Sequence, residues 1–266
     1  MTRIISGSVL VVLILAGVIY ATPVYFLLGI GFIGIVCLYE YFRLIRAMGI
    51  QVQPWPSYIL FWLLLIELNY RLWPLPALFA IALMATVLSA LWRRQSPRER
   101  TLALMAEALG VLYFVLFLYP AIAIRYEFGA KTGLHWMLLL LSVIWIGDTA
   151  ALVLGKTLGK FPLAPILSPR KTIEGAIGGL LAALGAGIAV HHFLFPDLPL
   201  LHAAIVSFLL GIFGQLGDLS ESMLKRAAGA KDSSNLIPGH GGAMDRMDSL
   251  LFAFPILYFY LSFLYR

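Results

Sequence analysis

The sequence predicts an all-α, polytopic integral membrane protein with about nine transmembrane helices. Its 266 residues are 61% hydrophobic and only 12% charged, and their mean hydropathy is +0.93. Soluble domains are roughly half apolar and about a quarter charged, so this composition excludes a water-soluble globule. The apolar residues also lie in long, nearly uncharged runs, each close to the ~20 residues that a helix needs to cross a bilayer.

Nine hydrophobic segments are expected to form the spans. They cover residues 4–21, 24–42, 56–69, 75–92, 102–124, 134–154, 173–195, 200–221 and 247–264. The third segment is short and has prolines at both ends, so we expect it to be tilted or incomplete. No sequence repeat and no linker is found, which predicts one domain over residues 1–266, with N-terminal spans in 1–133 and the candidate site in 134–266. The single cysteine, Cys37, excludes an intrachain disulfide and a cysteine-based zinc site.

The basic residues predict the orientation of these spans. Fifteen of the nineteen Lys and Arg residues fall on the side that holds the N-terminus and the loops around 43–55, 93–101, 155–172 and 222–246. Short loops rich in Lys and Arg stay in the cytoplasm. We therefore expect the N-terminus and these loops to be cytoplasmic and the C-terminus outside, in a bacterial inner membrane. Because topology accounts for the positive charge, we expect no nucleic-acid partner.

Carboxylates gather near the cytoplasmic ends of three predicted helices. Five of the thirteen acidic residues fall between positions 218 and 248, namely Asp218, Glu221, Asp232, Asp245 and Asp248. Asp148 lies close to the cytoplasmic end of the sixth segment. A charge in an apolar run costs several kcal/mol unless it is paired or faces water. We therefore interpret this cluster as an active site at the cytoplasmic edge of the membrane.

The residues around the end of the eighth segment have the spacing and chemistry of a metal–polyphosphate site. One helical face would carry, at i, i+3, i+4 and i+7, Asp218, Glu221, Ser222 and Lys225. The chain continues with Arg226, Lys231 and Asp232, and then with the run Pro238-Gly239-His240-Gly241-Gly242. Carboxylates bind Mg²⁺, Lys and Arg neutralise phosphate oxygens, and glycines let backbone N–H groups approach. Ordinary ion pairs at helix ends remain the alternative interpretation.

A second basic loop is expected on the same side of the membrane. It carries Lys156, Lys160, Arg170 and Lys171, with Ser168 and Thr172 as candidate caps of the seventh segment. A capped helix N-terminus favours a bound anion. The alternative is that these charges serve only to fix the topology.

At these positions the sequence resembles the phosphatidate cytidylyltransferase family, also called CDP-diacylglycerol synthases. The family pattern is a Ser, then Lys-Arg, then Lys-Asp, and finally Pro-x-His-Gly-Gly-x-x-Asp-Arg-x-Asp. This chain matches it with Ser222, Lys225, Arg226, Lys231, Asp232, Pro238, His240, Gly241, Gly242, Asp245, Arg246 and Asp248. Residues Asp148–Lys160 and Ser168–Gly175 also resemble family segments, so the likeness extends over 145–250. Leu152 and Ala243 depart from the family pattern, at positions that are neither charged nor phosphate-binding.

The resemblance implies an enzyme that transfers the cytidylyl group of CTP to phosphatidic acid, giving CDP-diacylglycerol and pyrophosphate with the help of Mg²⁺. The implied metal ligands are Asp218 and Asp245, followed by Asp248 and Asp148, and a second, monovalent cation stays open. The expected catalytic residues are Asp218, Asp245, Lys225 and His240. The expected substrate contacts are Lys171, Ser168, Arg226, Arg246, Ser222, Gly241 and Gly242. Membrane lipids are further expected partners, and a homodimer is compatible with the sequence.

Other interpretations stay open. A secondary transporter would carry charges near the bilayer midplane in both halves of an inverted repeat, whereas the charges here lie in one half and at one edge. A CDP-alcohol phosphotransferase would carry an Asp-Gly-x-x-Ala-Arg signature, which is absent, and the intact polar motif argues against an inactive scaffold. Glu40, Glu67 and Glu107 lie in or near spans with nothing convergent expected around them, and we predict that they are satisfied buried acids.

Overall fold

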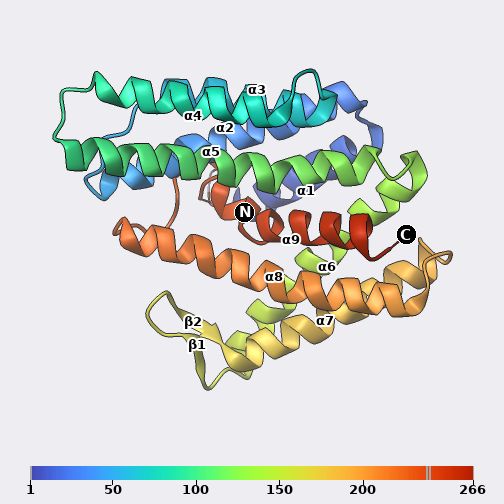
Figure 1. The fold of residues 1–266 in the computed structure, drawn as a ribbon. Helices are drawn as coiled ribbons and strands as arrows, with labels where there is room; N and C mark the ends of the chain where they lie inside the picture. The colour runs from blue at the N-terminus through green and yellow to red at the C-terminus, as the bar shows by residue number, and fades with distance from the viewer. Residues whose placement is uncertain (1, 238, 240, 266) are drawn as a thin grey trace. The chain divides into compact units, whose positions relative to one another are not determined.

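The computed structural model describes residues 2–237, 239 and 241–265, with side chains from residue 6 onward. Within this part of the chain there are nine helices and one short hairpin of two strands (Figure 1). The elements are α1 (Thr2–Tyr20), α2 (Pro23–Ala47), α3 (Pro54–Tyr70), α4 (Leu75–Leu91), α5 (Pro97–Tyr126), α6 (Ala130–Thr157), β1 (Pro162–Ala164), β2 (Ser168–Thr172), α7 (Ile173–Phe193), α8 (Leu200–Ala227) and α9 (Met244–Phe263). Each predicted hydrophobic segment coincides with one of these helices.

The all-α class is confirmed, and the apolar helices are those of an integral membrane protein. Among the described residues, five helices are long and apolar enough to cross a membrane, namely α2, α5, α6, α7 and α8. Two further apolar stretches, Ser6–Tyr20 and Leu75–Leu91, are shorter. The number of nine transmembrane spans therefore stays a prediction.

Proline and one left-handed residue account for several helix boundaries. Pro23 and Pro54 lie at the first helical positions of α2 and α3, where the missing N–H has no intrahelical partner to lose. At the end of α3, Arg71 adopts a left-handed conformation (φ 54°) and its N–H bonds the carbonyl of Glu67. This conformation ends the helix because it cannot continue the right-handed path.

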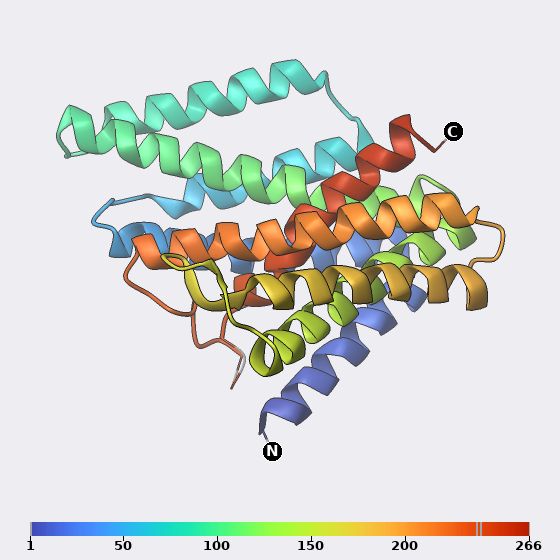
Figure 2. The same ribbon diagram turned by 90° about the horizontal axis from the view of Figure 1, so that it is seen from below.

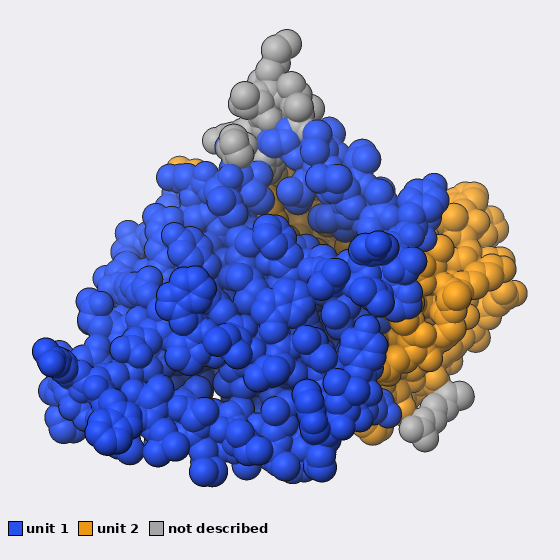
Figure 3. Space-filling view, turned by 90° about the horizontal axis from the view of Figure 1, so that it is seen from above, with its two compact units in different colours: residues 1–122, 224–245 blue, residues 123–223, 246–266 orange. Residues whose placement is uncertain are grey.

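The chain divides into two compact units, which Figure 3 colours separately. The first comprises Met1–Ile122 and Leu224–Asp245, and the second comprises Ala123–Met223 and Arg246–Arg266. The boundaries fall inside α5 and α8 and near the start of α9, so these three helices contribute residues to both units.

Two buried glutamates, Glu107 and Glu67, bind an arginine and backbone N–H groups in the first unit. Arg93 contacts both carboxylate oxygens of Glu107 at 2.9 and 2.7 Å, with only 2% of either side chain exposed. Glu107 also accepts a hydrogen bond from the backbone N–H of Gln53. Glu67 accepts the backbone N–H groups of Leu72 and Trp73. The prediction that these two glutamates are satisfied buried acids is confirmed.

Close backbone approach defines the second unit. A Cβ on Gly179 would lie 2.7 Å from that of Ala151, so α6 and α7 pack with their backbones nearly in contact. Further along α7, a Cβ on Gly187 would overlap the hydroxyl of Ser207 in α8. Figure 2 shows α7 and α8 running side by side as an antiparallel pair. Small residues at these contacts are what close helix packing in a membrane requires.

A β-hairpin between α6 and α7 was not predicted from the sequence. Its two strands pair antiparallel, with Pro162 opposite Thr172 and Ala164 opposite Ser168. Glu174 accepts hydrogen bonds from the backbone N–H groups of Lys160 and Phe161, which ties the start of the hairpin to α7. Of the two candidate caps, the hydroxyl of Thr172 accepts the N–H of Gly175, so Thr172 is the N-cap of α7.

Candidate active site

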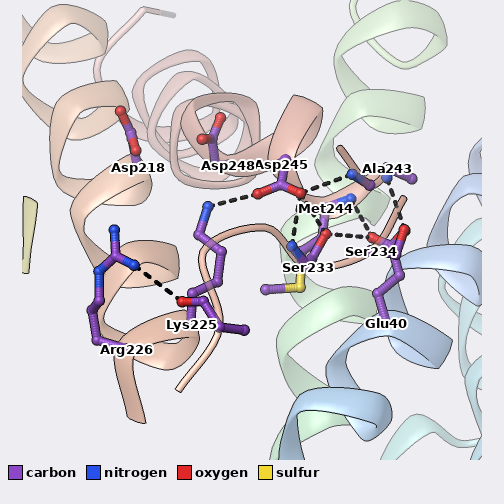
Figure 4. Close-up of polar contacts among 12 residues, drawn as sticks. Glu40, Asp218, Lys225, Arg226, Ser233, Ser234, Ala243, Met244, Asp245 and Asp248 are labelled. Carbon is purple, nitrogen blue, oxygen red and sulfur yellow. Dashed lines mark hydrogen bonds and ion pairs between the residues drawn. The ribbon is translucent and has the colours of Figure 1, made fainter. Parts of the chain in front are cut away.

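Asp245, in the first turn of α9, is the centre of a buried polar network in the first unit (Figure 4). Its Oδ1 accepts a hydrogen bond from Lys225 Nζ at 2.6 Å. Its Oδ2 accepts the backbone N–H groups of Ser233 and Gly242, each at 2.8 Å, and also lies 2.8 Å from the Ser233 hydroxyl. Only 4% of the Asp245 side chain is exposed, so these partners replace water as its solvent.

Glu40 of α2 holds the other side of the same loop (Figure 4). Its Oε1 accepts hydrogen bonds from the hydroxyl of Ser234 and the backbone N–H of Ala243. Its Oε2 accepts the backbone N–H of Met244 and lies 2.9 Å from the Ser233 hydroxyl. Glu40 is fully buried, and it binds N–H groups at the start of α9, where a negative charge is stabilised. Glu40 is thus a satisfied buried acid, as predicted, but the expectation that no polar groups converge on it is wrong.

The two glycines of the predicted phosphate loop are required by these carboxylates. Gly241 has a φ of +79°, and a Cβ there would lie 2.7 Å from Oδ2 of Asp245. A Cβ on Gly242 would lie 2.1 Å from the Ser233 hydroxyl oxygen and 2.4 Å from an oxygen of Glu40. Both positions exclude any larger residue because a carboxylate lies directly against the backbone.

Three charged residues predicted before the glycine run are exposed to solvent. Arg226 is exposed and donates to the carbonyl of Ala230 at 3.1 Å. Lys231 and Asp232 are also exposed. His240, predicted as a catalytic residue, lies outside the described residues.

The second unit brings together predicted residues from α6, α8, α9 and β2. Lys171 of β2 forms an ion pair with Asp218 of α8, and about a third of each side chain is exposed (27% and 31%). Asp148 of α6 lies next to the Ser249 hydroxyl and within electrostatic range of Asp218, Lys171 and Arg246. The assignment of Asp148, Asp218, Lys171 and Arg246 to one metal and phosphate site stays a prediction.

The remaining predicted residues of the second unit are placed as follows. Asp248 accepts a hydrogen bond from the N–H of Ser249 at 2.7 Å, in the first turns of α9. Ser222 is buried on α8, and Ser168 begins β2 and is half-buried. A cavity of about 10 Å³, room for a single water, lies beside Asp148 and has Gln215 as its other polar wall residue.

The donor set of the second unit fits a hard cation better than the network around Asp245 does. Asp148 and Asp218 lie within electrostatic range of each other, and a cation bound between two carboxylates would reduce the repulsion between them. Both oxygens of Asp245, by contrast, are already engaged by donors that include an ammonium group. Among the described residues, no group of three or more acidic, His or Cys side chains is arranged to hold a metal. Mg²⁺ commonly needs only one or two carboxylates together with substrate phosphates.

Glu40 and Ser233 are the residues of this network that sequence reasoning missed. Each bonds partners far away along the chain, with separations of 193 residues between Ser233 and Glu40 and 204 between Met244 and Glu40. The only signal in the sequence was an ionisable residue inside an apolar run, which marks a functional position in a membrane protein.

Comparison with known proteins defines the class of this membrane protein. The sequence matches the cytidylyltransferase family over residues 1–264, and the chain belongs to this family. The match extends well beyond 145–250, the region on which the resemblance rests.

Individual relatives share a more specific name. A phosphatidate cytidylyltransferase of Staphylococcus haemolyticus (strain JCSC1435) is 40% identical over 190 residues, which is 71% of this chain and 68% of the relative. Another of Staphylococcus aureus (strain COL) is 38% identical over 214 residues, covering 80% of this chain and 76% of the relative. A third, of Staphylococcus epidermidis (strain ATCC 35984), is 36% identical over 217 residues. The comparisons give the transporter interpretation no support.

Proposed function

We propose that the protein transfers the cytidylyl group of CTP to phosphatidic acid, releasing pyrophosphate and forming CDP-diacylglycerol for phospholipid synthesis. The observation that carries this proposal is a complete polar motif from Ser222 to Asp248, in a chain that the cytidylyltransferase family matches from residue 1 to residue 264. The family relatives named above are phosphatidate cytidylyltransferases, which fits the same substrates.

In the proposed reaction the protein forms no covalent bond with the substrates. The phosphate of phosphatidic acid is already anionic at neutral pH, so an oxygen of it attacks the α-phosphorus of CTP without a strong base. The bond from the α-phosphorus to the bridging oxygen breaks, and its electron pair leaves with pyrophosphate. Catalysis then consists of alignment and neutralisation of the negative charge that develops on the leaving group.

The cations of the two basic loops are suited to this neutralisation. We assign Lys171, Arg226 and Arg246 to phosphate oxygens of the substrates, and Lys225 to both Asp245 and the phosphates. The N–H of Gly242 already donates to Asp245, so Gly241 is the glycine that we assign to a phosphate oxygen. His240 is assigned to the departing pyrophosphate, either as a proton donor or as a simple hydrogen-bond donor.

We assign the Mg²⁺ site to Asp218 and Asp148, with Asp248 as a further ligand. Asp245, which was also predicted as a ligand, has both oxygens engaged by Lys225, Ser233 and Gly242. A bound Mg²⁺ would supply positive charge to the phosphates and hold them in line. Asp218 and Lys171 form an ion pair in the structure, so binding of a metal would release Lys171 for a phosphate oxygen. A second, monovalent cation fits the same proposal.

The proposed orientation places the N-terminus and both basic loops in the cytoplasm and the C-terminus outside. It rests on the fifteen Lys and Arg residues on that side of the nine proposed spans. CTP is a cytoplasmic metabolite, so this orientation gives it direct access to the site. A homodimer is part of the same proposal.

The direct test is formation of labelled CDP-lipid by purified protein given CTP, phosphatidic acid and Mg²⁺. We expect product and pyrophosphate in equal amounts, and none without the lipid or after chelation of Mg²⁺. Asp218→Asn keeps the size of the side chain but removes the charge, so activity is expected to fall by orders of magnitude. If the wild type makes no pyrophosphate, the proposed function is wrong. Wild-type turnover and unchanged Mg²⁺ dependence in Asp218→Asn would refute the metal assignment.

A further inference from the structure

We infer that Glu40 is a positioning residue for the reaction, which holds the two ends of the Ser233–Met244 loop, residues 233–234 and 243–244, in their working conformation through hydrogen bonds to its carboxylate. This inference rests on the proposed function for the reaction that it serves. Glu40 lies on α2, outside the residues that carry the family motif, and it has no assigned contact with CTP or the lipid.

Two hydroxyls and two backbone N–H groups surround the carboxylate of Glu40. A carboxylate offers about four acceptor sites, two on each oxygen. Ser234 Oγ and Ala243 N contact Oε1 at 2.5 and 3.0 Å, while Ser233 Oγ and Met244 N contact Oε2 at 2.9 and 2.8 Å. The two hydroxyls come from one end of the loop and the two N–H groups from the other. A single buried side chain thus joins both ends of the segment.

Ser233 links Glu40 to Asp245 through its hydroxyl and its backbone N–H. Its hydroxyl lies between Glu40 Oε2 and Asp245 Oδ2, and its backbone N–H donates to the same oxygen of Asp245. Arg43, one turn after Glu40 on α2, donates to the Ser233 carbonyl at 3.4 Å. Two residues of α2 therefore contact Ser233, one at its hydroxyl and one at its carbonyl. Because Ser233 in turn donates to Asp245, the position of Asp245 depends on α2.

Gly242 shows how closely the loop is fitted to Glu40. Both carboxylate oxygens of Glu40 lie within 2.5 Å of the place where a Cβ of residue 242 would stand. Position 242 of the proposed phosphate loop therefore has room only for glycine, because Glu40 of α2 lies against it. A shift of this loop by about 1 Å is enough to lower an enzymatic rate by roughly a hundredfold.

Glu40→Gln isolates this role, with Glu67→Gln as the matched control. In Glu67 one oxygen, Oε2, accepts both N–H groups, so an amide in the right orientation keeps both bonds. In Glu40 each oxygen accepts one backbone N–H, from Ala243 or Met244, and a backbone N–H cannot accept a hydrogen bond, so an amide NH₂ must face one such donor in either orientation. Both changes remove one buried charge from unit 1, but only the first disrupts the loop.

The experiment measures hydrogen exchange of the 233–244 peptide, together with kcat and KM for CTP per folded molecule. Glu40→Gln is expected to raise exchange in this peptide and lower kcat by about 10- to 100-fold, while Glu67→Gln changes neither by more than about twofold. Glu40→Asp keeps both oxygens but shortens the reach, so it should give intermediate values and serves if Glu40→Gln does not fold. Wild-type exchange, or wild-type kcat, in either Glu40 variant would overturn the inference. If the wild type makes no CDP-lipid, the proposed function fails, while the exchange data still decide whether Glu40 holds the loop.

Discussion

Replacing Lys225 by Met tests the buried ion pair at the centre of the first unit. Met has a similar length, so the change removes the ammonium group that lies 2.6 Å from Asp245 and little packing. With only 4% of the Asp245 side chain exposed, water cannot replace the lost partner. Breaking such a pair costs roughly 3–5 kcal/mol. Asp245 keeps its bonds to Ser233 and Gly242, so we expect about 3 kcal/mol, the lower end of that range.

This loss can be read from thermal unfolding of the protein in detergent. For a chain of this size, about 3 kcal/mol corresponds to a decrease in Tm of roughly 6–12 °C. Adding Asp245→Asn to Lys225→Met removes the unpaired charge, so the double variant should recover part of the lost stability but no activity. A wild-type Tm for Lys225→Met, or a double variant that loses the full sum of both single effects, would refute a buried pair that depends on charge.

Three further predictions follow from the loops. Asn235 is exposed in the described structure, so Asn235→Cys in a Cys37→Ser background should react with an impermeant thiol reagent only in inverted vesicles; labelling of intact cells would reverse the proposed orientation. Gly242→Ala would place a Cβ 2.1 Å from the Ser233 hydroxyl, so kcat should fall by about tenfold or more even with saturating CTP, as for a displaced site; wild-type turnover would show that the loop adapts. Lys171→Ala should slow pyrophosphate release by roughly a hundred- to thousandfold, about 3–4 kcal/mol; a loss confined to CTP affinity would make Lys171 a docking residue only.

The helices of this protein could be predicted from hydrophobicity alone. Every predicted apolar segment lies on a helix because the chain must satisfy its backbone polar groups internally within a bilayer. Prolines at positions 23 and 54 and the charges around 43 and 93 marked the intervals between spans. The hairpin of residues 162–172 was missed because its strands are three and five residues long and show no alternating pattern.

The site was predicted by residue type but not by contact. The membrane depth of the carboxylates and the family resemblance put Asp148, Asp218 and Lys171 in one predicted site. In the structure Lys171 and Asp218 form an ion pair, and the roles of the three residues stay predictions. It could not show that Lys225 and Asp245 are partners, since an ion pair across a loop depends on how that loop folds. Glu40 was out of reach for a stronger reason. Its partners lie about 200 residues away, and no local pattern links an acid in the second span to hydroxyls and N–H groups of the last loop.

That separation has a consequence for how the protein is made. When α2 leaves the ribosome, the hydroxyls and N–H groups that will bind Glu40 have not yet been synthesised. At about 5–20 residues per second, translation needs roughly 10–40 s to advance the 204 residues from Glu40 to Met244. Through this interval a charged side chain of the second helix lacks its native partners, and only the nearly complete chain can supply them.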